Sequence, residues 1–123
     1  MRILLLIGTG GFIGSVGRYL LSVLIQDKML SSFPFGTLSV NIIGCFLIGA
    51  LFALSEKGMV STDWRLFLVT GVCGGFTTFS SFSNETIALM RGGQIGYAFA
   101  YVAASLILGL LATFLAITIF KLI

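Results

Sequence analysis

Apolar residues dominate the chain in four long runs, separated by three short polar stretches. The runs cover about residues 3–25, 35–54, 65–90 and 95–120, and the polar stretches centre on residues 26–28, 55–58 and 91–94. A spanning helix needs about 20 mostly apolar residues to cross a hydrocarbon core roughly 30 Å thick. The pattern therefore predicts four transmembrane helices in a single domain, residues 1–123.

The composition agrees with a membrane protein. Hydrophobic side chains make up 58% of the chain and charged ones only 9%, whereas soluble domains carry about 25% charged residues. We therefore expect an all-α membrane protein with the lipid bilayer as its solvent. The net charge of +3 is too dispersed along the chain to indicate a nucleic-acid partner.

The first residues, Met1 to Leu6, resemble the start of a signal peptide. No small-residue cleavage site follows, and the apolar run continues past Gly14. We therefore expect this segment to be retained as the first helix.

Basic residues are almost evenly divided between the two membrane sides. One side collects Arg2, Lys57, Arg65 and Lys121 and the other Lys28 and Arg91, with Arg18 nearer the second side. A bias this weak can reflect a noisy rule applied to short loops. The alternative is insertion in both orientations, which permits an antiparallel homodimer whose two-fold axis lies in the membrane plane.

The first run contains closely spaced glycines and one buried charge. Gly10 and Gly14 have the four-residue spacing that allows helices to pack closely in lipid. Arg18 lies roughly 12 Å below the nearer surface, at about 1.5 Å rise per residue. A charge at this depth needs water, a partner or a route to the surface. Glu85 is the one acid at a similar depth, so we predict an Arg18–Glu85 pair.

Polar residues also interrupt the second and fourth runs. Asn41 must find hydrogen-bond partners or line water, and both helix-to-helix bonding and pore lining remain open. Residues four apart in the fourth run form a polar or small stripe that we expect to face protein or a pore: Tyr97, Tyr101, Ser105, Gly109 and Thr113.

The middle of the third run, residues 71–84, is poorly suited to a continuous helix. Paired glycines and threonines have low helix propensity, so we predict a break near residues 74–78. Carbonyls freed there can hold a cation, whereas the following half-helix start and hydroxyls suit an anion. Phe79 and Phe82 share one face and can present positive ring edges to that anion, although the residues alone favour ordinary packing for both rings.

Two segments together resemble a known family. Gly36-Thr37-Leu38-Ser39-Val40-Asn41 is followed about thirty residues later by Gly71-Val72-Cys73-Gly74-Gly75-Phe76-Thr77-Thr78-Phe79-Ser80-Ser81-Phe82-Ser83. This order, with Arg18 after a glycine-rich start, closely resembles the Fluc family of bacterial fluoride channels, also called CrcB proteins. The resemblance covers essentially the whole chain.

The resemblance implies a multi-pass protein of the bacterial inner membrane. It would be a dual-topology, antiparallel homodimer with two pores, exporting fluoride passively and so relieving fluoride toxicity. HF crosses membranes uncharged and ionises inside, which traps fluoride in the cell.

The resemblance also assigns residues. Those matching the fluoride pathway are Phe79, Phe82, Asn41, Ser80, Ser81 and Arg18, with Tyr101 and Ser105 carried over from the fourth run. Gly74 and Thr77 match the positions whose backbone carbonyls, two from each subunit, hold a structural sodium ion on the dimer axis.

Three other classes of protein are alternatives. A small dual-topology multidrug transporter depends on a carboxylate in the first helix, where this chain has Arg18. A holin-like assembly protein would use the same polar residues only to join helices, without ion selectivity. An enzyme is not expected, since histidine is absent, Cys45 and Cys73 are isolated and expected to be free thiols, and no nucleophile and base lie together.

Overall fold

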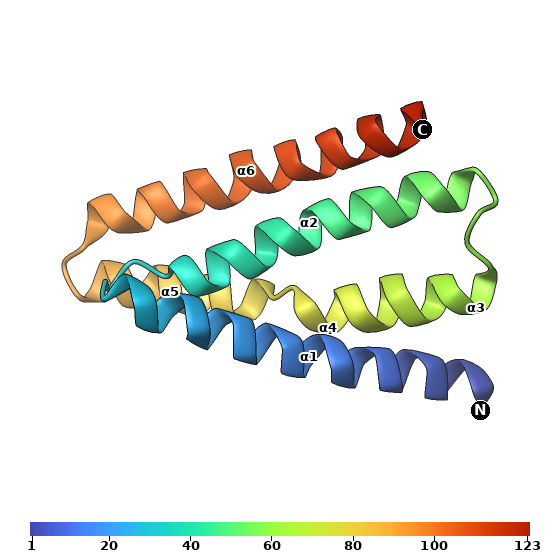
Figure 1. Cartoon of the computed structure of the whole chain (residues 1–123). Coiled ribbons are helices and arrows are strands. Elements are labelled where there is room, and N and C mark those ends of the chain that lie inside the picture. The colour runs from blue at the N-terminus through green and yellow to red at the C-terminus, as the bar shows by residue number, and fades with distance from the viewer.

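The computed structural model describes all residues, 1–123, and is entirely helical. Four helical segments are long and apolar enough to cross a membrane, as the hydropathy pattern predicts: α1 (Arg2–Met29), α2 (Phe35–Glu56), a composite third segment (Thr62–Arg91) and α6 (Ile95–Leu122). Each is longer than its predicted run at one or both ends. The segments lie side by side, with both termini at one end of the bundle (Figure 1).

The third segment is composed of four elements. A short α3 (Thr62–Arg65) leads into the π-helix η1 (Leu66–Cys73), then one turn of α4 (Gly74–Phe76), and after a gap α5 (Phe79–Arg91). Thr77 (φ −87°, ψ 152°) and Thr78 (φ −148°, ψ 116°) have extended backbones between α4 and α5. The gap lies midway along the bundle (Figure 1).

Glycines bring α1 into backbone contact with the first half of this third segment. A Cβ atom added to Gly14 would collide with the carbonyl of Val72, and one on Gly75 would lie 2.5 Å from the carbonyl of Gly11. Helices in lipid associate through such close van der Waals packing, because apolar surface gains little by leaving the lipid tails. The glycine spacing in the first run therefore serves intramolecular packing, as predicted.

The helix α2 packs along α6 on the other side of the bundle. Gly49 allows the backbone of Thr113 to approach, and the Thr113 hydroxyl donates to the Cys45 carbonyl at 3.0 Å. Tyr101 and Gly109 are buried at this contact, so the polar or small stripe of the fourth run faces protein where those residues lie. Tyr97, at its end, is exposed.

Most large apolar side chains point outward. Only 18 of 123 residues are buried, and the exposed ones include Leu4, Phe12, Phe99 and Leu110. Such a surface is suited to lipid tails rather than water. Cys73 is buried and Cys45 half-buried, and both thiols are free, as expected.

Two ion pairs join neighbouring helices at the end of the bundle that holds both termini. Arg2 of α1 pairs with Asp63 of α3, and Lys121 of α6 pairs with Glu56 of α2 at 3.0 Å. Trp64, next to Asp63, packs edge-to-face on Phe67 with ring centroids 5.8 Å apart. These contacts involve exposed side chains at the membrane edge.

Candidate functional site

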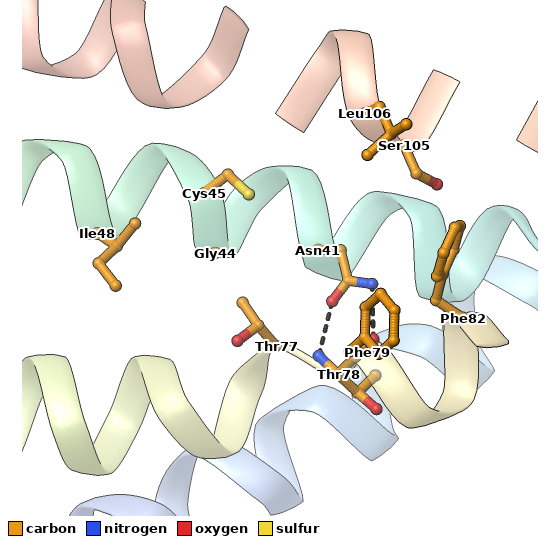
Figure 2. A pocket seen from close by; sticks show the side chains of 10 residues that line it. All are labelled: Asn41, Gly44, Cys45, Ile48, Thr77, Thr78, Phe79, Phe82, Ser105 and Leu106. Atoms are coloured by element: carbon orange, nitrogen blue, oxygen red, sulfur yellow. Dashed lines mark hydrogen bonds between the residues drawn. The ribbon is translucent and has the colours of Figure 1, made fainter. Parts of the chain in front are cut away.

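Asn41 of α2 supplies the hydrogen bonds that the backbone loses at the gap in the third segment. Its Oδ1 accepts from the Thr78 N–H at 2.8 Å, and its Nδ2 donates to the Thr78 carbonyl at 3.0 Å (Figure 2). A buried peptide group without partners would cost about 1–3 kcal/mol. Asn41 therefore joins α2 to the gap and stabilises its extended backbone.

The start of α5 is capped by its own side chains. The Thr78 hydroxyl accepts from the Ser81 N–H at 3.1 Å and lies 3.3 Å from the Ser80 hydroxyl. The first N–H groups of a helix have no partner within it and carry a partial positive charge. Because α5 starts midway along the bundle, this positive end lies inside the bilayer.

Arg18 is located at the same gap, on the side of α1. Its Nε donates to the Gly75 carbonyl at 3.1 Å, a carbonyl in the last turn before the gap. The predicted Arg18–Glu85 pair is wrong, since neither residue forms a salt bridge in the structure. Glu85 faces α2 and α6, whereas Arg18 projects from α1 and contacts the gap.

Glu85 lies in a hydrogen-bonded network instead. Its two carboxylate oxygens accept from the Thr37 hydroxyl at 2.7 Å and from the Tyr101 hydroxyl at 2.8 Å. Thr37 is not among the residues predicted from the sequence to belong to the site. Its spacing of four residues from Asn41, which places both on one face of α2, is the signal that could have found it.

Aromatic rings connect the gap to this network. The Phe79 and Phe82 ring centroids are 5.6 Å apart, and Phe82 and Tyr101 are 5.1 Å apart. Phe79 is 78% exposed although it lies midway along the third segment. Its exposed ring lies directly after the gap, where α5 begins.

An open pocket of about 340 Å³ lies in front of the gap (Figure 2). Its walls come from α2, the gap, α5 and α6, and the predicted residues among them are Asn41, Thr77, Phe79, Phe82 and Ser105. The buried Ser105 hydroxyl has no hydrogen-bond partner. The pocket thus combines apolar walls with a few polar groups, the usual composition of a small-ligand site.

The other predicted residues lie outside this pocket. Ser80 and Gly74 are exposed, Ser81 is half-buried, Arg18 donates to the Gly75 carbonyl, and Tyr101 packs on the Phe82 ring. Thr77 donates its hydroxyl to the Cys73 carbonyl at 3.0 Å. No three His, Cys, Asp or Glu side chains come together as a metal site.

Comparison with known proteins decides the family. The chain matches the family described as CrcB-like protein, Camphor Resistance (CrcB), over residues 5–117. The protein belongs to the CrcB family. The CrcB match covers most of the four spans, the gap and every residue of the candidate site.

Individual CrcB relatives carry a more specific name. Proteins named fluoride-specific ion channel FluC are similar at 47% identity in Phocaeicola vulgatus, covering 95% of this chain and 97% of the relative, and at 51% in Parabacteroides distasonis, covering 98% and 94%. The Thermus thermophilus protein of that name is 51% identical over 90% and 89%. With four spanning helices and bacterial CrcB relatives, this is a multi-pass bacterial membrane protein.

Proposed function

We propose that this protein is a fluoride-selective channel that lets fluoride leave the cytoplasm passively and so relieves fluoride toxicity. The observation that carries the proposal is full-length similarity to proteins named fluoride-specific ion channels. These relatives are named as channels, in agreement with the prediction that the chain is not an enzyme.

The geometry of the pocket supports an anion as the permeating species. The positive start of α5, together with the Thr78 hydroxyl and the Phe79 ring that line the pocket, would present partial positive charge to a small ion there. These groups are neutral, so they can replace part of a hydration shell without trapping the ion. Fluoride accepts strong hydrogen bonds, which favours a route lined by donors.

The row of aromatic rings from Phe79 through Phe82 to Tyr101 suggests the direction of the route. From the pocket, an ion would pass Phe82 and reach the hydroxyls of Thr37 and Tyr101, which now donate to Glu85. A hydroxyl can rotate from one acceptor to another. Donors from α2 and α6 would thus be available to the ion.

We further propose that the third span works as a broken helix within an antiparallel homodimer. Phe79 is exposed midway along its segment and the pocket in front of it is open, so one chain leaves the route unfinished on one side. A second copy would cover this face. The nearly even division of basic residues between the two membrane sides favours insertion in both orientations.

A structural sodium ion on the dimer axis fits the same arrangement. Gly74 is exposed on the third segment, and the backbone of Thr77 leaves the helical path at the gap. Carbonyl oxygens are the hard ligands that sodium prefers, and two copies would bring four of them together. When bound, the ion would hold the two gaps against each other.

Flux from liposomes tests the channel. Purified protein is reconstituted into vesicles loaded with potassium fluoride or potassium chloride, valinomycin is added, and the released anion is followed with an ion-selective electrode. We expect rapid fluoride release with chloride retained. No release, or equal release of both anions, would overturn the proposal, and equal release would favour the holin-like alternative.

Thiol labelling tests the dual orientation. Gln94→Cys places a thiol in the short loop between α5 and α6. A membrane-impermeant reagent added outside intact cells should label about half of the Gln94→Cys protein, and permeabilised cells should allow the rest to react, if copies insert both ways. Complete or absent labelling from outside would show a single orientation.

A further inference from the structure

A second polar pocket lies one helical turn from the first. It has a volume of about 400 Å³, and its polar walls are Ser22, Gln26, Asp27, Ser32, Thr37 and Glu85. Thr37 precedes Asn41 by four residues on α2, and Glu85 follows Phe82 by three on α5, so the same two helix faces line both pockets. The α1–α2 loop, which supplies Ser32 and Pro34 to this pocket, lies at the end of the bundle opposite the two termini (Figure 1).

The side chain of Gln26 holds this loop in place. Its Nε2 donates to the Ser31 carbonyl at 2.8 Å and to the Phe33 carbonyl at 3.0 Å, and its Oε1 accepts from the Gly36 N–H at 3.0 Å. Both amide hydrogens and the amide oxygen are therefore used. One half-buried side chain of α1 thus joins the end of α1, the loop and the first turn of α2.

The loop in turn places an aromatic ring against the Glu85 network. The Phe33 ring lies 5.6 Å from that of Tyr101, edge-to-face, and its backbone carbonyl is one of the groups bound by Gln26. Tyr101 is fully buried, and its hydroxyl donates to Glu85. A chain of contacts therefore runs from Gln26 through Phe33 and Tyr101 to the carboxylate that lines the second pocket.

We propose that the second pocket is the aqueous mouth of the ion route and that Gln26 is a positioning residue that keeps this mouth open. Gln26 acts through the loop: it keeps Ser32 at the rim and Phe33 on Tyr101, so that the Tyr101 hydroxyl stays directed at Glu85. The inference rests on the proposed channel function, because a mouth needs a route behind it.

Single-channel recording tests the role of Gln26. Gln26→Leu keeps the approximate size of the side chain but cannot bond to the loop, and we expect its unitary fluoride current to fall by about tenfold. Gln94→Leu is the matched control, since Gln94 lies in the loop at the same end and its side chain forms no hydrogen bond. A purely structural role would lower the number of active channels but leave the current per channel unchanged, and that result would overturn the proposal.

Thiol modification tests the mouth without disturbing Gln26. Ser32→Cys is treated with an anionic, water-soluble methanethiosulfonate, labelling is quantified by mass spectrometry, and fluoride flux is compared before and after. We expect labelling and a flux at least several-fold lower, with no change after labelling Gln94→Cys; the parent chain reports the background from Cys45 and Cys73. If the thiol stays unlabelled, or is labelled without loss of flux, the proposal that this pocket is the mouth is overturned. The proposed channel function is not affected by that result. Absence of fluoride flux before labelling would instead count against the channel itself.

Discussion

The two halves of the third span are held by different kinds of contact. The first half, η1 and α4, lies directly on the α1 backbone at glycines such as Gly14 and Gly75. The second half, α5, is held by side-chain hydrogen bonds, from Asn41 to the residue before it and from Tyr101 to Glu85 within it. The gap at residues 77–78 separates the two.

This difference reflects the separate tasks of the two halves. In lipid, small residues allow the close approach that holds helices together, whereas polar side chains are costly unless they bond to each other or meet water or an ion. The first half is therefore scaffold, and the second half carries the proposed route. Changes in the first half should lower the amount of folded protein, and changes in the second should lower flux through protein that still folds.

The largest effect is expected from Gly14→Ala. The added methyl group would collide with the carbonyl of Val72 and lie 2.9 Å from the Phe76 nitrogen, so two backbones must separate. Overpacking of this kind costs about 1–3 kcal/mol or more. We expect most of the folded protein to be lost, as measured by size-exclusion chromatography in detergent.

Gly8→Ala is the control for this substitution. Gly8 is on the same helix with nothing within 4 Å of an added Cβ, and both variants gain the same helix propensity, about 1 kcal/mol. Equal yields from the two variants would show that the contact between α1 and η1 is not tight.

Replacement of the rings at the pocket should have the next largest effect. Phe79→Ile and Phe82→Ile remove aromatic edges while keeping apolar bulk, and we expect fluoride flux per folded protein to fall by about tenfold or more. Phe99→Ile, which changes an exposed ring on α6, is the control. Unchanged flux in both pocket variants would show that the two rings do not contribute to the ion route.

A smaller effect is expected from Tyr101→Phe. The ring stays packed on Phe82, but the 2.8 Å hydrogen bond to Glu85 is lost. A hydrogen bond contributes about 0.5–1.5 kcal/mol net, so we expect flux to fall several-fold with the protein still folded. The exposed Tyr97 supplies a matched Tyr97→Phe control; if both variants conduct alike, the Tyr101 hydroxyl has no part in permeation.

The smallest effect is expected at the membrane edge. Lys121→Ala breaks the ion pair with Glu56, in which both side chains are about half-exposed. Exposed ion pairs contribute about 0–1 kcal/mol. Thermal unfolding in detergent and fluoride flux should both stay close to the parent values, and a large loss of either would show that this end of the bundle also governs the route.

The four spans and the glycine contacts could be predicted because each depends on local pattern. Length and hydropathy define a span, and four-residue glycine spacing defines a face that can approach another helix. Neither requires knowledge of which helices are neighbours. The sequence likewise predicts that Asn41 lies within the second span. It does not predict that the Thr78 backbone is the hydrogen-bond partner of Asn41.

The failed Arg18–Glu85 pair shows where such inference stops. Depth in the membrane follows from residue number, but direction around each helix axis depends on packing. Arg18 points to the Gly75 carbonyl, and Glu85 points to Thr37 and Tyr101. The π-helix η1 also shifts the direction of every later residue in the third span, and no residue pattern signalled it.

Trp64 is the sole tryptophan of the chain, and it lies beside the ion pair that joins α1 to α3. Its fluorescence therefore reports on one end of the bundle alone. Emission maximum and quenching by brominated lipids would follow the depth of α3 in the bilayer, and would do so without an attached dye. The same signal would register separation of α3 from α1 during unfolding, independently of events at the gap.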